Sequence, residues 1–307
     1  FNKVAFPGKN TPILEIVDFL NARARENQWG FVDFNRPMVA INQWEQAEDS
    51  MYTLCGKDRI HPSTDGHLVM AYLFLKAQGL AGKPVADIRI DGAGKKVTRS
   101  DNCRVSDLSV SSDNLTFTYE AKSLPYPIDT SYYDNEKHTQ ADALSVIPFM
   151  DEMNYEGLSV SGLSDGYYGL TIGGEFIGRF TARELERGIN MALLQNTPQY
   201  KQAMKIRQMN EERWLKERKM REFYWVEYNL MRKTGMLWAC NEAAVDTLRK
   251  YRPHDIFLQW NGALWLQYMH KGIREDCVNE QQDLVNQIYE QNKPIPLQIE
   301  IKKFTDL

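Results

Sequence analysis

The sequence predicts an α/β region, then an antiparallel β region, then a helical C-terminal region. Three observations indicate this order. Residues 1–83 hold an amphipathic helical pattern followed by a short apolar run, as in α/β proteins. Residues 84–181 hold short alternating segments separated by turn residues, and residues 182–307 hold long charged segments with helical spacing. We expect these three ranges to be the domains of the protein.

The first region begins with a helix that is predicted over residues 12–28. Thr11 suits its N-cap, and Pro12 suits the first helical position. One face of this helix carries the apolar residues Ile13, Ile16, Val17, Leu20 and Ala24. Residues 31–34, Phe-Val-Asp-Phe, then indicate a short buried strand. A helix followed by a buried strand is half of an α/β repeat, so a parallel sheet is expected here.

The second region is predicted to be mostly antiparallel β. Its alternating segments cover residues 86–90, 107–110, 115–119, 158–163, 168–172 and 175–180. Gly173-Gly174 lies between the last two segments and is typical of a two-residue hairpin loop.

The third region is predicted to be mostly helical. Thr181 and Glu184 have the spacing of a capping box, which marks a helix start. Helices are expected over residues 198–233, 241–251 and 276–291, and a last strand over residues 297–301.

The bulk composition narrows the classes of function. Hydrophobic residues make up 43% of the chain and charged residues 25%, as in soluble globular proteins. The net charge of −4 argues against general binding of nucleic acid, because no basic excess is present to neutralise phosphates. No apolar run reaches the length of a membrane span. The four cysteines have no zinc-ligand spacing and are expected to be free or buried thiols.

The segment Gly56-Lys57-Asp58-Arg59-Ile60-His61-Pro62 carries the main candidate chemistry. Asp58 precedes His61 by three residues, just before a helix that Ser63 or Thr64 can cap. A hydroxyl nucleophile needs a neutral imidazole to accept its proton, and a carboxylate on the other ring nitrogen holds that imidazole in place. Asp58 and His61 are therefore the candidate catalytic residues, with His61 as general base.

Together with Gly66-His67-Leu68-Val69-Met70-Ala71, this segment resembles the last conserved block of the SGNH (GDSL-type) esterases and lipases. Residues 31–38 are similar to the strand that leads to that block in the family. Residues 124–127 and 160–192 are similar to the C-terminal extension of a bacterial subgroup. The resemblance implies that residues 1–83 are the C-terminal part of a flavodoxin-like three-layer catalytic domain.

The resemblance also implies an ester hydrolase with a serine nucleophile, no cofactor, and an acylated carbohydrate, such as an acetyl ester, as substrate. The family's Gly-Asp-Ser motif has no counterpart in this sequence, nor do the Gly and Asn of its oxyanion hole. Ser164 lies in the wrong order within residues 162–166, and Asn261 lies too far downstream. We therefore expect the nucleophile to lie upstream of this chain and the isolated chain to be inactive. Its expected partner, in a nicked protein, is the N-terminal half, and export to the periplasm or outside is expected.

The remaining histidines and the aromatic residues of the long helix are expected to have structural roles. His67 is expected on the helix surface or in a capping role. His138, His254 and His270 have no metal-ligand spacing and are expected to be isolated surface histidines. The aromatic residues around Trp214 and Phe223 are expected to pack in a core rather than to stack on sugars.

An alternative function is a non-catalytic module that binds a glycan or a protein. The β region would be that module, and tyrosines at its loop positions would make the contacts. These tyrosines are Tyr126, Tyr132, Tyr133, Tyr167 and Tyr168.

Overall fold

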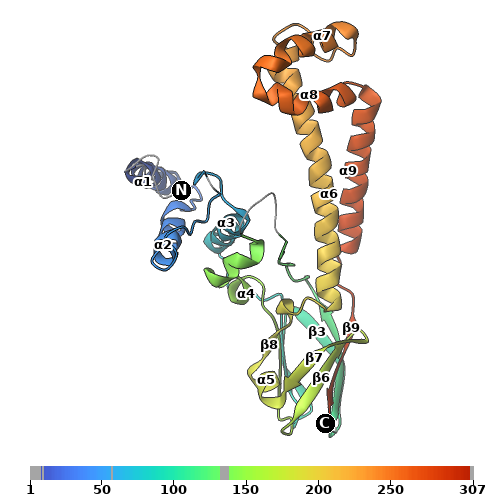
Figure 1. Ribbon diagram of the computed structural model, residues 1–307. Coiled ribbons are helices and arrows are strands. Elements are labelled where there is room, and N and C mark those ends of the chain that lie inside the picture. Colours follow the sequence, from blue (N-terminus) through green and yellow to red (C-terminus); the bar gives the residue numbers. More distant parts are fainter. Residues whose placement is uncertain (1–7, 9, 57, 132–137, 305–307) are drawn as a thin grey trace. The chain divides into compact units, whose positions relative to one another are not determined.

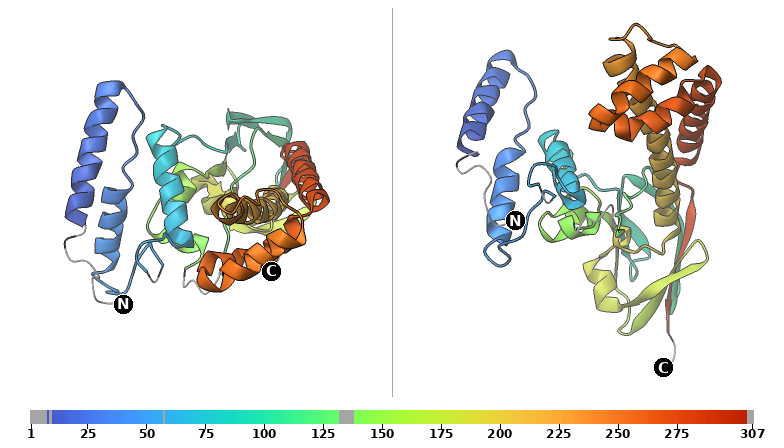
Figure 2. Two further views of the ribbon diagram at one scale, coloured as in Figure 1. Left: turned by 90° about the horizontal axis from the view of Figure 1, so that it is seen from above. Right: turned by 45° about the horizontal axis from the view of Figure 1, so that its top comes forward.

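The computed structural model describes residues 8, 10–56, 58–131 and 138–304 of the chain. The chain divides into two compact units, each described by itself below (Figures 1 and 2). Unit 1 comprises residues 1–200 and 294–307, and unit 2 comprises residues 201–293. The expected mixed α/β class with a helical C-terminal region is confirmed. The domain boundaries at residues 83 and 181 stay a prediction.

Unit 1 contains two sheets. The first has the strand order β2-β1-β5-β8 and the second the order β3-β4-β9-β6-β7. Their strands are β1 (Ala86–Asp91), β2 (Lys96–Asp101), β3 (Cys103–Val110), β4 (Asn114–Ala121), β5 (Glu156–Ser161), β6 (Tyr167–Ile172), β7 (Glu175–Thr181), β8 (Ile189–Asn190) and β9 (Leu297–Lys303). Most neighbouring pairs are antiparallel, as the sequence predicts, but β1 and β5 pair in parallel. The parallel pair requires the long connection between these strands, which contains three further strands, β2, β3 and β4, and two short helices.

The two sheets share one hydrophobic core. In β4, Leu115, Phe117 and Tyr119 are buried at alternate positions, as the period of a strand requires. The same core contains Ile88 from β1 and Ile299 from β9. Strand β9 lies between β4 and β6, so the C-terminal end of the described chain completes the second sheet.

The N-terminal part of unit 1 differs from the expectation. Its helices are α1 (Asn10–Asn27), α2 (Asn35–Glu45) and α3 (Thr64–Ala77). The strand expected over residues 31–34 is wrong, because these residues form neither helix nor strand and α2 begins directly after them. The apolar face predicted for the first helix is present in α1, but most of it is not buried: Ile16 and Leu20 are exposed, and Ala24 is the buried residue. Periodicity indicated the helix correctly, but burial depends on a partner surface that the sequence pattern does not specify.

A second core in unit 1 holds α3 in place. Leu68, Val69 and Tyr72 from α3 are buried together with Ile147 and Phe149. The latter residues belong to the segment of η1 (Gln140–Ser145) and α4 (Phe149–Glu152). Unit 1 also contains the short helices α5 (Ala182–Arg187) and η2 (Met191–Leu193). The capping box expected at the start of α5 is present, with Thr181 and Glu184 bonding reciprocally.

Unit 2 is helical. Its elements are most of α6 (Pro198–Val226), a π-helical turn η3 (Glu227–Met231), α7 (Glu242–Tyr251), η4 (Arg252–His254), α8 (Ile256–Tyr268) and α9 (Lys271–Gln291). Helix α8 was not expected from the sequence. At the π-helical turn, the buried carboxylate of Glu227 accepts hydrogen bonds from the Trp265 indole and the backbone N–H of Trp238, both at 2.8 Å. These bonds satisfy a buried charge that would otherwise be costly.

The aromatic side chains of unit 2 are divided between core and surface. Phe223 is fully buried, as expected for core packing, and Trp225 packs against the same core. Trp214, Tyr224 and Tyr228 are exposed, so the expectation of core packing holds for only part of the set. Among the described residues, no helix combines the length and the apolar character that crossing a bilayer would require.

The tyrosines that were expected to contact a glycan differ in exposure and in bonding. Tyr168 is buried, and its hydroxyl bonds to Ser164, so it cannot stack on a ligand. Tyr167 is exposed but lies under the Arg179 guanidinium, 3.7 Å from its ring centre. Tyr126 is bonded to Gln140. Tyr132 and Tyr133 lie outside the described residues.

Candidate functional site

Residues 55–56 and 58–62 belong to a loop whose two ends are joined. The backbone N–H of Gly56 donates to the His61 carbonyl at 2.8 Å, and Cys55 forms a β-bridge with Pro62. Below this bridge, the Ser63 N–H and hydroxyl both donate to the Leu54 carbonyl, at 3.0 and 2.9 Å. The loop therefore has a closed base, and its tip presents Asp58 and His61.

The structure brings the two predicted catalytic residues together. Nδ1 of His61 lies 2.5 Å from Oδ2 of Asp58. The other oxygen of Asp58 accepts the backbone N–H groups of Ile60 and His61, at 2.9 and 3.1 Å. The hydrogen bond from His61, followed by these backbone bonds, lowers the pKa of Asp58 to about 2.

This geometry determines the form of the neutral imidazole. With an ionised carboxylate at Nδ1, that nitrogen carries the proton and Nε2 carries the lone pair. The His61 side chain is 83% exposed and that of Asp58 46% exposed, so Nε2 is accessible. The pair can therefore accept a proton from an approaching hydroxyl group and stabilise the resulting imidazolium.

The loop contains a strained residue between the two catalytic candidates. Arg59 has a backbone φ of 55°, in the left-handed region that non-glycine residues rarely adopt. Its backbone N–H donates to the Gly56 carbonyl at 2.9 Å. Strain of this kind persists where the surrounding bonds determine the conformation, as the Asp58 and Gly56 bonds do here.

The first turn of α3 anchors the loop. Gly66 lies against the loop base, and a Cβ placed on it would stand 2.0 Å from the carbonyl oxygen of Leu54. His67 donates from Nδ1 to the Ser63 carbonyl at 2.9 Å, in line with the role expected for it at a helix start. Because α3 is buried through Leu68 and Val69, the loop is attached to a packed element.

A second aspartate–histidine contact escaped the sequence-based reasoning. Asp65 is fully buried in the first turn of α3, and its Oδ1 accepts the Ser63 hydroxyl. Its Oδ2 lies 3.3 Å from Nδ1 of His138, whose side chain is 29% exposed. His138 also packs edge-on against Tyr52, with ring centres 5.8 Å apart. The expectation of an isolated surface histidine at position 138 is therefore wrong. No spacing in the sequence signals this contact, because it depends on the fold.

A corresponding contact occurs in unit 2. Sγ of the exposed Cys240 lies 3.3 Å from Nδ1 of His270, so His270 is not isolated either. All four cysteines are free, as expected. Among the described residues, no group of three or more side chains could hold a metal ion.

Three described candidates for a nucleophile, Ser63, Cys55 and Ser164, are unsuited to that role. The Ser63 hydroxyl is engaged by Leu54 and Asp65. Burial, followed by the nearby Asp58 and Asp65, raises the pKa of the Cys55 thiol, which disfavours the nucleophilic thiolate. Ser164 bonds to Tyr168 and lies in the turn before β6, as expected for a residue outside the site.

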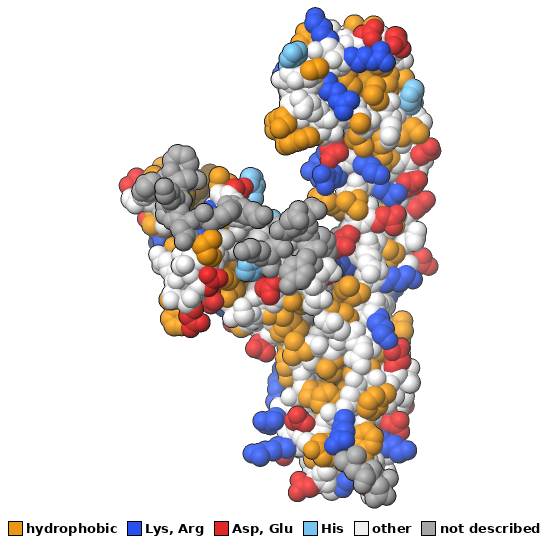
Figure 3. All heavy atoms as spheres, in the orientation of Figure 1, with side chains coloured by type: hydrophobic (Ala, Val, Ile, Leu, Met, Phe, Trp, Pro, Cys, Tyr) orange, Lys and Arg blue, Asp and Glu red, His pale blue; other side chains and the backbone are white. Residues whose placement is uncertain are grey.

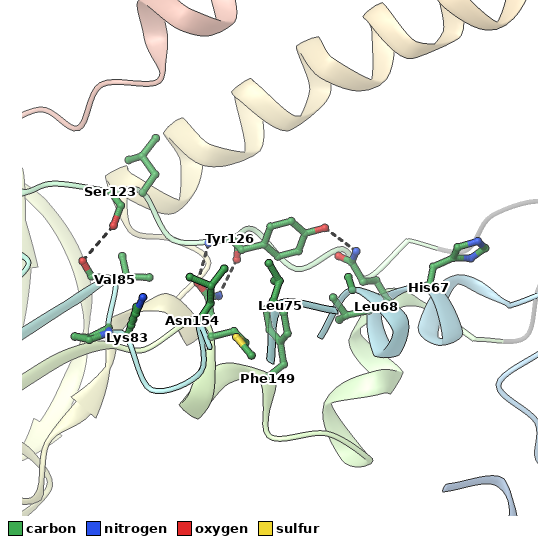
Figure 4. Close-up of a pocket in the computed structure, with 15 residues that line it drawn as sticks. His67, Leu68, Leu75, Lys83, Val85, Ser123, Tyr126, Phe149 and Asn154 are labelled. Carbon is green, nitrogen blue, oxygen red and sulfur yellow. Dashed lines mark hydrogen bonds between the residues drawn. The ribbon is translucent and has the colours of Figure 1, made fainter. Parts of the chain in front are cut away.

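Helix α3 also lines a cavity of about 720 Å³ (Figure 4). His67 and Lys83 lie at opposite ends of the set of lining residues in this view. Most of the other lining side chains are apolar, among them Leu68, Leu75 and Phe149.

Residues 204–293 match the family described as the diltiazem deacetylase C-terminal helical domain. A solved structure titled a gut microbial diltiazem-metabolizing enzyme is 41% identical in sequence, with a TM-score of 0.91. The match covers 97% of this chain and 67% of that chain. The chain belongs to the diltiazem deacetylase family. No curated protein was found to match the sequence.

The membership in the diltiazem deacetylase family confirms the expected hydrolase class. It corrects the resemblance to the SGNH esterases and lipases, because the matching family and structure are those of the diltiazem deacetylase. The separate segments on which that resemblance depended are less specific than a match over most of the chain. The roles of Asp58 and His61, the serine nucleophile and the carbohydrate substrate stay predictions.

Proposed function

We propose that this protein hydrolyses an acyl ester and that Asp58 and His61 are its orienting acid and general base. The 2.5 Å contact between Asp58 Oδ2 and His61 Nδ1 carries the proposal, together with the exposure of the imidazole. A carboxylate whose pKa is held at about 2 stays ionised at neutral pH, which is the form that orients a base.

The proposed reaction has two halves. In the first, Nε2 of His61 accepts the proton of a serine hydroxyl while the oxygen attacks the ester carbonyl. The imidazolium then donates this proton to the leaving alcohol, and an acyl-enzyme remains. In the second half, His61 accepts a proton from water, the hydroxide oxygen attacks the acyl-enzyme, and the proton returns to the serine. Asp58 stabilises the imidazolium in both halves.

We propose that the serine and the oxyanion donors lie on polypeptide outside these 307 residues. The engagement of Ser63 and the raised pKa of Cys55 support this view. The related enzyme is also longer, since this chain spans 67% of it. The isolated chain is then inactive, because the loss of a triad nucleophile leaves only residual rate enhancement.

The proposed substrate is an acetyl ester, and the word deacetylase in the family name, which denotes removal of an acetyl group, supports the acetyl part of this proposal. To test whether the substrate is an acetylated carbohydrate, hydrolysis of such a compound is compared with hydrolysis of an aromatic acetyl ester. p-Nitrophenyl acetate and a peracetylated monosaccharide serve as the two substrates, and release of acetate is the common measurement.

The test uses the complete gene product that contains this chain. In His61→Ala we expect kcat to fall by about 10³- to 10⁴-fold, and in Asp58→Asn by a similar factor, since an unanchored base adopts the wrong tautomer. His254→Ala is the matched control, because His254 is exposed and lies in unit 2. Unchanged turnover in His61→Ala would remove His61 from the mechanism. Acetate release by the isolated chain, lost in His61→Ala, would place the nucleophile within it.

A further inference from the structure

The cavity beside α3 has the dimensions of a small-molecule site. Its volume of about 720 Å³ lies within the range of pockets that hold ligands of drug size. Its lining includes Ala71 and Leu75 from α3, and Phe149 and Met153 from α4 and the residue after it. Figure 4 shows Leu75 and Phe149 next to each other. The cavity lies entirely within unit 1.

The polar groups on the walls bond to the protein itself. The Asn154 amide accepts the Tyr126 N–H at 2.8 Å and donates to the Tyr126 carbonyl at 2.9 Å. Gln140 donates to the Tyr126 hydroxyl at 2.8 Å, and the Ser123 hydroxyl donates to the Val85 carbonyl at 3.3 Å. The walls therefore offer mainly apolar surface to an occupant. A polypeptide would leave its backbone N–H and C=O groups without partners there, so a small apolar molecule fits better.

Lys83 and His67 both line the cavity and have polar atoms available to a ligand. The Lys83 ammonium has no hydrogen bond or ion pair with any residue that the structure describes, and it is exposed. His67 uses Nδ1 for the Ser63 carbonyl, so its Nε2 can accept a hydrogen bond. Among the described residues that line the cavity, none is an aspartate or a glutamate, and the charged side chain among them is Lys83.

We propose that this cavity binds an elongated apolar molecule that carries a carboxylate, with the carboxylate at Lys83 and the apolar body along α3. The apolar walls exclude a strongly polar ligand, and the lysine favours an anion over a cation. The site is distinct in its residues from Asp58 and His61, so the inference does not depend on the proposed hydrolysis.

Calorimetric titration of the 307-residue chain with decanoate tests the proposal. Decyltrimethylammonium is the matched probe, with the same alkyl length and the opposite charge. We expect saturable binding of decanoate to the unmodified chain and at least tenfold weaker binding of the cation. In Lys83→Gln the affinity for decanoate falls about tenfold, as expected for the loss of one charge-assisted bond. Lys83→Arg retains the affinity.

Three controls make the result specific. Lys122→Gln removes an exposed lysine from the same unit and leaves decanoate affinity unchanged. Ala71→Trp fills the cavity and abolishes binding, while circular dichroism checks that the variant is folded. His61→Ala binds decanoate as the unmodified chain does, so a failure of the hydrolase proposal is separable from a failure here. Absence of saturable decanoate binding, equal affinity for both probes, or equal losses in Lys83→Gln and Lys122→Gln would each overturn the proposal.

Discussion

Gly66 lies so close to Leu54 that a Cβ on the glycine would stand 2.0 Å from the Leu54 carbonyl oxygen. The same oxygen accepts both hydrogen bonds from Ser63 that close the base of the loop. The first turn of α3 and the loop that presents Asp58 and His61 are therefore one packed unit. A glycine is required at this position by backbone contact, and not by an unusual backbone angle.

Gly66→Ala should destabilise unit 1 by about 1–3 kcal/mol, because the added methyl group must displace the Leu54 backbone. Urea denaturation measures the change. Gly30→Ala is the matched control, since nothing lies within 4 Å of a Cβ at Gly30, and its effect should stay within about 0.5 kcal/mol. Equal effects of the two substitutions would show that the contact at Leu54 relaxes at no cost.

The buried Asp65 should contribute to stability, because its Oδ1 accepts hydrogen bonds from the Ser63 hydroxyl and the Gly66 N–H, whereas, among the described residues, Oδ2 has only the ion-pair contact with His138. Asp65→Ala leaves Ser63 and His138 without their partner and should cost about 3 kcal/mol. A double-mutant cycle with His138→Ala isolates the contact at 3.3 Å, and we expect a coupling of about 1 kcal/mol. A coupling near zero would show that His138 lies beside Asp65 without stabilising it.

Asp58 should titrate at about pH 2 instead of its ordinary 3.8, because His61 and two backbone N–H groups bond to its ionised form. A lowered pKa means that the stabilisation is present above pH 3.8 and is lost as the pH falls towards 2. Carbon-13 NMR of the labelled carboxyl group measures this value. In His61→Ala the pKa should rise towards 3.8, and it should remain lower if the backbone bonds alone determine it.

Glu156 should make unit 1 less stable as the pH rises. The carboxyl group is fully buried between Tyr119 and Gln199, and burial raises its pKa from 4.5 to about 7. Between these values the unfolded chain has lost the proton that the folded chain still binds, so the free energy of unfolding falls with pH, by up to about 3 kcal/mol. Above about pH 7 the fall should level off.

Urea denaturation from pH 4.5 to 8 measures this slope. Glu156→Gln should remove most of it, since a neutral amide keeps the size of the side chain without titrating. Glu186→Gln, at an exposed position of the same unit, should leave the slope unchanged. Retention of the slope in Glu156→Gln would assign it to other groups.

Local sequence determined several elements of this protein. The alternation in Leu115, Phe117 and Tyr119 predicted a strand with one buried face, and the capping box at Thr181 predicted a helix start. The Asp58–His61 contact also follows from local sequence, because three residues of a tight loop can bring both side chains to one point. Contacts between residues a few positions apart are predictable because they depend on local backbone geometry, which the neighbouring side chains restrict.

Tertiary structure decided the rest. The strand expected at residues 31–34 does not form, although its composition favoured one, because a strand requires a pairing partner. Asp65 and His138 meet only after α3 and the segment that follows β4 have packed. The parallel pairing of β1 with β5 and the place of β9 between β4 and β6 likewise join residues far apart in the chain. Such contacts are selected by the burial of a shared core, and no short sequence pattern encodes the partner that a buried face will meet.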